Sequence, residues 1–178
     1  MTHLTVWMGN YLAGARREKT AVLEWNAHGD FQKMRHFCAE KSGNCRSVQP
    51  FRILEVDYYA DAGSRELADC LNGDYRRILI DFGENTGEGI CECARCDRKV
   101  IVGALSEWQA EAFLGLFRGD ARRDKSWRYA AAFGSEETRK ECKKTFKEEI
   151  LRVPLSVDAF AVTRADMDFF ARLLQEQA

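Results

Sequence analysis

Acidic and polar residues follow three segments that have the composition of buried strands. One group is Glu24-Trp25-Asn26-Ala27-His28-Gly29-Asp30, a second is Asp57, and a third is Asp81-Phe82-Gly83-Glu84-Asn85. In a parallel α/β sheet, ligands bind in the crevice beyond the carboxyl ends of the strands. A carboxylate placed there can orient a metal-bound water or accept a proton. The sequence therefore predicts a candidate site, and the alternative is that these residues cap helices or form turns.

The cysteines offer a second, weaker candidate chemistry. Cys91, Cys93 and Cys96 form a C-x-C-x-x-C string, and Cys38 and Cys45 could add a ligand for zinc or a cluster. The string has no paired second half, so we expect no stoichiometric metal. Seven cysteines in a chain of this length favour reduced thiols over a disulfide framework.

The elements that must position these residues alternate between strand and helix patterns along the chain. This alternation predicts an α/β fold, a three-layer sandwich with a mainly parallel sheet. With 178 residues, 46% of them hydrophobic, the chain suits one core, so we expect residues 1–178 to form a single domain. The predicted strands are Thr20–Trp25, Phe51–Tyr59, Arg77–Asp81, Lys99–Leu105, Trp127–Phe133 and Ile150–Leu155. The predicted helices are Thr2–Ala13, Ser64–Leu71, Glu107–Phe117 and those opened by Ser135 and Thr163, with one or two further helical turns over Phe31–Cys38.

The overall charge gives no indication of a polyanionic partner. The formal net charge is -1, so composition gives no clear signal for nucleic acid or an anionic membrane. No apolar run approaches the ~20 residues of a membrane span, and the start has no basic n-region. We therefore expect a cytoplasmic protein.

Four segments together resemble the MinD/ParA-type (SIMIBI class) P-loop NTPases. TAVLEWNAHGDF (residues 20–31) is similar to that family's second strand, and DYRRILIDFG (74–83) resembles its Walker B strand. CDRKVIVGALSEWQAEAF (96–113) and ILRVPLSVDAF (150–160) are similar to the following strand and helix and to the late proline-containing strand. The resemblance covers nearly the whole chain and implies a P-loop NTPase-like, Rossmann-like fold.

The resemblance also implies roles for particular residues. Asp81 would meet the magnesium shell and, with Glu24, serve catalysis, while cofactor contacts would come from the residues in the matching positions, Thr2, Asn26, Gly29 and Gly83. The implied cofactors are ATP and Mg²⁺. The implied activity is that of a nucleotide switch, an ATPase whose hydrolysis controls dimerisation and partner binding.

The chain departs from the family at its most diagnostic motif. No stretch of the 178 residues has the form KGGxGKT, which cradles phosphates on backbone amides and a lysine. Two explanations stay open: a longer protein carries the loop upstream, or the chain has kept the scaffold without nucleotide chemistry. We therefore expect a form that is inactive as an ATPase and holds no cofactor. The alternative is a non-catalytic scaffold or protein-interaction module, and the partner is another protein or a second copy in a homodimer.

Overall fold

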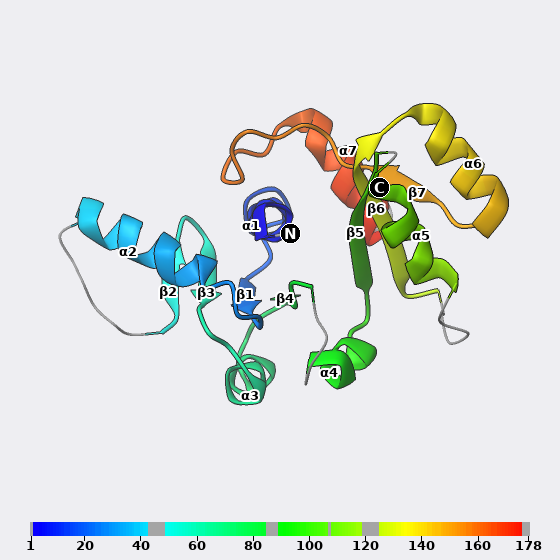
Figure 1. Cartoon of the computed structure of the whole chain (residues 1–178). Coiled ribbons are helices and arrows are strands. Elements are labelled where there is room, and N and C mark those ends of the chain that lie inside the picture. Colours follow the sequence, from blue (N-terminus) through cyan, green and yellow to red (C-terminus); the bar gives the residue numbers. More distant parts are fainter. Residues whose placement is uncertain (1, 43–48, 85–88, 107, 119–124, 176–178) are drawn as a thin grey trace. The chain divides into compact units, whose positions relative to one another are not determined.

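The computed structural model describes residues 2–42, 49–84, 89–106, 108–118 and 125–175. It divides into two compact units, each of which is described by itself (Figure 1). Unit 1 comprises residues 1–94 and 158–163, and unit 2 comprises residues 95–157 and 164–178. The single domain over residues 1–178 stays a prediction.

Unit 1 is built on a four-stranded sheet with the order β2-β3-β1-β4. β1 (Thr20–Glu24) pairs in parallel with both β3 (Val56–Tyr59) and β4 (Arg77–Asp81), and β2 (Phe51–Ile53) joins β3 antiparallel. Its helical elements are α1 (Thr2–Asn10), the π-helical turn η1 (Tyr11–Ala15), α2 (Asp30–Ser42), α3 (Ser64–Asn72) and α4 (Gly89–Arg95).

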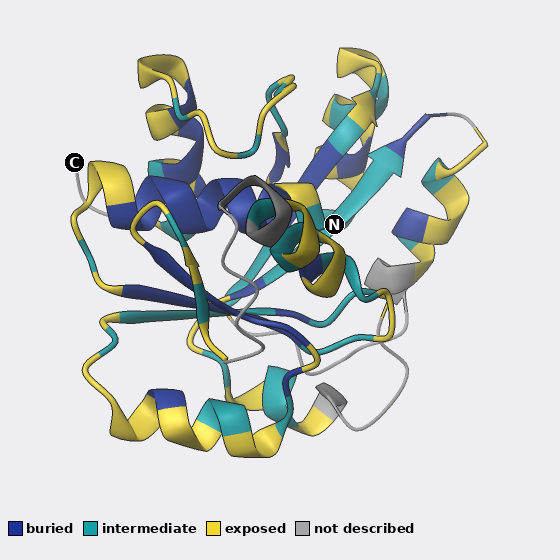
Figure 2. Ribbon diagram, turned by 90° about the vertical axis from the view of Figure 1, so that its left-hand side faces the viewer, coloured by how far each residue is buried: buried dark blue, intermediate teal, exposed yellow. Residues whose placement is uncertain are grey.

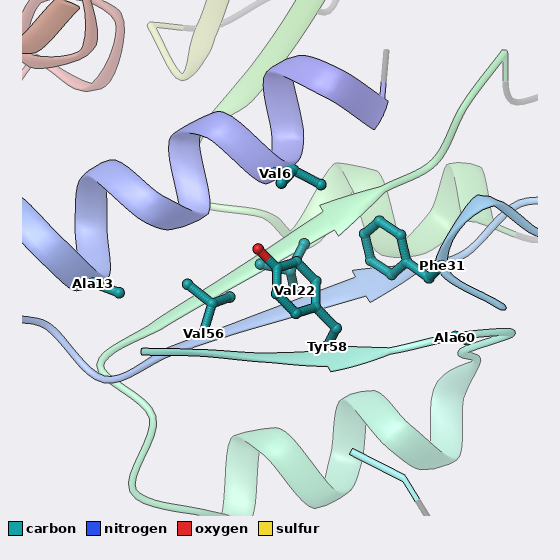
Figure 3. Close-up of a cluster of buried hydrophobic side chains, with 7 residues drawn as sticks. All are labelled: Val6, Ala13, Val22, Phe31, Val56, Tyr58 and Ala60. Carbon is teal, nitrogen blue, oxygen red and sulfur yellow. The ribbon is translucent and has the colours of Figure 1, made fainter. Parts of the chain in front are cut away.

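Alternation along the strands divides the unit 1 core between two faces of the sheet. Val22, Val56 and Tyr58 pack with Val6 and Ala13 of the first helical segment (Figure 3). The next residues along the strands, Ala21, Leu23 and Tyr59, pack with Cys70 of α3. Because successive side chains of a strand point to opposite faces, α1 and α3 cover opposite faces of this sheet.

α1 is buried along nearly its whole length. Every residue from Leu4 to Ala13 is buried, which Figure 2 shows as the dark blue helix. An apolar stripe of Leu4, Met8, Tyr11 and Leu12 predicts a helix with one buried face. The observed helix is buried on the other sides as well, because segment 158–163 also packs on it: Trp7 Nε1 donates to the carbonyl of Ala161 at 3.0 Å.

Unit 2 contains a three-stranded parallel sheet with the order β5-β6-β7. The strands are β5 (Lys99–Leu105), β6 (Trp127–Gly134) and β7 (Ile150–Arg152), and the helices are α5 (Ala110–Arg118), α6 (Glu136–Phe146) and α7 (Arg164–Leu174). Phe113 of α5 and Cys142 of α6 pack with Leu105, Tyr129 and Ile150. Figure 1 shows α7 on the side of this sheet away from α5 and α6.

The predicted turns over Phe31–Cys38 are part of the longer helix α2, and two predicted strands also differ from the structure. The predicted strand Phe51–Tyr59 is a hairpin, because Leu54 takes a left-handed conformation with φ of 52° and the chain turns between β2 and β3. The predicted strand Ile150–Leu155 ends at Arg152. The α/β class, with mainly parallel strands, is as predicted.

Candidate functional site

The carboxyl ends of β1 and β4 bring two buried carboxylates together in unit 1. Glu24 and Asp81 are the last residues of these strands and are partners in the β1–β4 register. Glu24 is fully buried, and Asp81 is 2% exposed. The sequence places both residues at this edge correctly.

Asp57 does not join them. It pairs with Ala21 near the start of β1, whereas Tyr59 pairs with Leu23 near its end. The sequence-based placement of Asp57 at a strand end is wrong, because the turn at Leu54 delays the start of β3. Asp57 instead accepts a hydrogen bond from the Tyr75 hydroxyl at 3.0 Å.

The Glu24 carboxylate caps the N-terminus of α2. Its Oε1 accepts the main-chain N–H of Asp30 at 2.6 Å, and its Oε2 accepts that of Phe31 at 3.1 Å. These are two of the amides that a helix leaves without internal partners. Burial raises the pKa of Glu24 above its usual value, and the nearby Asp30 and Asp81 charges raise it further, while the two amides lower it. Catalysis by Glu24 would therefore require this cap to open.

Asp81 has one satisfied oxygen and one unsatisfied oxygen. Its Oδ1 accepts the main-chain N–H of Gly83 at 2.9 Å. Its Oδ2 is buried and has no hydrogen-bond partner among the described residues. A buried carboxylate oxygen without a partner is costly, and such atoms in native structures call for an explanation.

Asn26 and the two glycines shape the loops beside these carboxylates. The Asn26 amide donates to the main-chain carbonyl of Asp81 at 2.9 Å and accepts the N–H of His28 at 2.9 Å. Gly29 and Gly83 both have positive φ, 66° and 62°, a conformation that favours glycine. A Cβ on Gly83 would lie 3.0 Å from Cβ of Asn26. The loop after β1 and the loop after β4 therefore pack closely on each other.

Thr2, at the start of α1, contacts the same region through α2. Its hydroxyl donates to Oδ2 of Asp30 at 3.1 Å. The other oxygen of Asp30 accepts from Lys33 at 2.9 Å, and that hydrogen bond, with the one from Thr2, lowers the pKa of Asp30. The structure thus brings the start of α1 to the start of α2, with the Thr2 hydroxyl on Asp30.

Cysteine does not form a metal centre in the described part of the chain. Cys91 is exposed there, and Cys38, Cys93 and Cys96 are half-buried. No group of three or more His, Cys, Asp or Glu side chains among the described residues is arranged to hold a metal ion. Cys45 lies outside the described residues. No helix in the described ranges is long and apolar enough to cross a membrane.

Comparison with known proteins bears on the fold. No protein-family model and no curated protein matches this sequence. Among solved structures, this chain is similar to a chain of the MinC:MinD cell division protein complex from Aquifex aeolicus. The TM-score is 0.62 and the identity 17%, over 99% of this chain and 91% of that chain. The likeness confirms the predicted Rossmann-like α/β fold and indicates a MinD-like arrangement, but at this identity it shows the fold alone.

Proposed function

We propose that this chain is a MinD-like protein of the nucleotide-switch class that is inactive as an ATPase and acts by binding a protein partner. The observation that carries the proposal is the state of the polar groups at the ends of β1 and β4. Both oxygens of Glu24 and both polar atoms of the Asn26 amide are bound within the chain. Polar groups that are already hydrogen-bonded to the chain itself support a structural role over a catalytic one.

The described residues do not fit Mg²⁺-ATP on their own. Mg²⁺ prefers six oxygen ligands, usually one or two carboxylates together with waters and phosphates. Asp81 Oδ2 is one such acceptor, but no segment of the sequence has the glycine-rich form that cradles phosphates. We therefore assign no hydrolytic step to this chain.

A protein partner fits the fold by analogy. The similar solved structure is a complex of two proteins, MinC and MinD. A second copy of this chain is the simplest partner, because β4 ends the strand order of unit 1 and its outer edge has no strand partner among the described residues.

The free oxygen of Asp81 supports a second candidate function. In that alternative, a phosphate-binding segment outside these 178 residues completes the site, and Asp81 Oδ2 faces the magnesium ion. Glu24, Thr2, Asn26, Gly29 and Gly83 would then surround the nucleotide as the family resemblance implies. The buried, unpartnered oxygen is the observation that favours this alternative.

Calorimetry and sedimentation distinguish the two functions. Titration of the chain with ATP and MgCl₂ should give no binding heat, and sedimentation velocity should give the same profile with and without Mg²⁺-ATP. Micromolar binding of ATP that is abolished by Asp81→Asn would contradict the inactive form and support the second candidate function. A nucleotide-dependent change in association would do the same.

A further inference from the structure

A cavity of about 520 Å³ lies in unit 2, beside the edge strand β7. Its lining residues belong to α6, to β7 with the residue before it, and to α7. Figure 1 labels these three elements. The volume lies within the range of pockets that bind ligands or anchor side chains. The cavity shares no residue with the ends of β1 and β4.

Positive charge dominates the lining. The cationic lining residues are Arg139, Lys140, Lys143, Arg152 and Arg172, and the anionic ones are Glu149 and Asp168. The chain as a whole has a net charge of -1, so this concentration of cations is local. A pocket whose lining carries a net positive charge attracts anionic ligands.

The arginines and lysines of the pocket differ in their partners. Arg139 and Arg152 share Glu136, at 2.7 and 3.3 Å, and Arg172 pairs with Glu149 at 2.9 Å. Arg139 also donates to the main-chain carbonyl of Ile150 at 3.0 Å. The arginines therefore hold the walls together.

The side chains of Lys140 and Lys143 have no hydrogen bond or ion pair in the part of the chain that the structure describes. They lie three residues apart on α6, where neighbours at this spacing share a helix face. Two ammonium groups on one face are thus available to an anionic ligand.

Apolar side chains also line this cavity. Leu151 is 6% exposed and Phe169 is 8% exposed, and both contribute to the lining. A ligand that fits must therefore place an apolar group against them and carboxylates against the lysines. The apolar pair Leu151 and Phe169 beside the lysines favours an acidic peptide with an apolar side chain over a phosphate backbone, which carries charge without an apolar group.

We propose that this pocket binds an acidic peptide segment of a partner protein, with one apolar side chain held against Leu151 and Phe169. The proposal deepens the proposed function and rests on it for the choice of a protein partner. The carboxylates of the segment pair with Lys140 and Lys143, and its apolar anchor enters the cavity beside β7.

Fluorescence anisotropy with a labelled peptide tests the assignment. The probe is an octapeptide of glutamates with one central leucine, and the control peptide has glutamines in place of the glutamates. The glutamate peptide should bind and the glutamine peptide should not. Lys140→Glu with Lys143→Glu should weaken binding by about tenfold or more, because two attractive pairs become repulsive.

A matched pair of changes, on α6 and on its C-cap residue, controls for net charge. Lys144→Glu with Lys147→Glu alters the same total charge at two exposed residues that do not line the cavity. It should change affinity by less than about threefold. Lys140→Gln with Lys143→Gln provides a milder variant if the reversed charges impair folding, which thermal denaturation detects.

Three outcomes would overturn the pocket assignment. They are no binding of the acidic peptide, equal loss of binding in both glutamate variants, and displacement of the peptide by an oligonucleotide that binds more tightly. Failure of the proposed function has a different signature, since Mg²⁺-ATP binding would overturn that function and leave peptide binding to unit 2 measurable.

Discussion

Glu24 and Asp81 are register partners at the ends of two parallel strands, and only Glu24 has hydrogen-bond partners on both of its oxygens. Asp81 keeps Oδ2 unpartnered among the described residues while buried beside it. The negative charge of Asp81 helps to raise the pKa of Glu24. This pair is therefore where changes of charge should have the clearest effect on stability.

Removal of the Glu24 carboxylate should destabilise unit 1. Glu24→Ala leaves the N–H groups of Asp30 and Phe31 without their acceptors at the start of α2. We expect the free energy of unfolding to fall by about 2 kcal/mol, measured by urea denaturation. Glu55→Ala, at an exposed residue, should change it by less than about 0.5 kcal/mol. Equal losses in the two variants would contradict the capping role.

Glu24 should also make stability depend on pH. Its folded pKa lies above its ordinary value of 4.5, so the folded state binds more protons than the unfolded state between those two values. The contribution of Glu24 to the free energy of unfolding is therefore greatest below pH 4.5 and falls as pH rises through the folded pKa.

Glu24→Gln isolates this effect, because glutamine does not titrate. The stability of the native chain relative to Glu24→Gln should decrease as pH rises through that window, in urea denaturations run at a series of pH values. Asp81→Asn should narrow the pH range over which this decrease occurs, because it removes one of the charges that raise the pKa of Glu24. If the difference in free energy of unfolding between the native chain and Glu24→Gln stays constant with pH, the raised pKa of Glu24 is contradicted.

Gly83 and Gly29 form a matched pair for a test of loop packing. Both have positive φ, so alanine is strained at either residue. A Cβ at Gly83 also meets Asn26 at 3.0 Å, whereas one at Gly29 has nothing within 4 Å. Gly29→Ala should lower the free energy of unfolding by about 1 kcal/mol, and Gly83→Ala should lower it further. Thermal denaturation measures both changes. Equal losses of stability would show that Asn26 moves to accommodate the added Cβ without a measurable loss of stability.

Strands β4 and β5 were predictable because their sequence signals are local. Arg77–Asp81 and Lys99–Leu105 have the predicted bounds, since runs of isoleucine, leucine and valine end at polar or turn residues. The hairpin within Phe51–Tyr59 was missed because Leu54 makes the turn without glycine, asparagine or proline. Tertiary pairing of β2 with β3 outweighs the local preference there.

The two sites differ in how far the sequence predicts them. Strand ends place Glu24 and Asp81 together, yet the cap on α2 depends on a loop geometry that the sequence pattern does not encode. The basic pocket was missed altogether, because Lys140, Leu151 and Phe169 belong to three separate elements. The only local signal for it is the pair of lysines on one face of α6.

Trp7 should control how firmly segment 158–163 is held on α1. Its indole N–H donates to the carbonyl of Ala161 at 3.0 Å, and the side chain is 1% exposed. Trp7→Phe removes the donor and leaves that carbonyl without its partner, so the free energy of unfolding should fall by about 1–2 kcal/mol. The amides of residues 158–163 should exchange faster in hydrogen-exchange mass spectrometry. Trp108→Phe, at a side chain 82% exposed, is the control and should change neither quantity. Unchanged hydrogen exchange in Trp7→Phe would mean that other contacts hold the segment, such as the hydrogen bond from Asn10 to the carbonyl of Ala159.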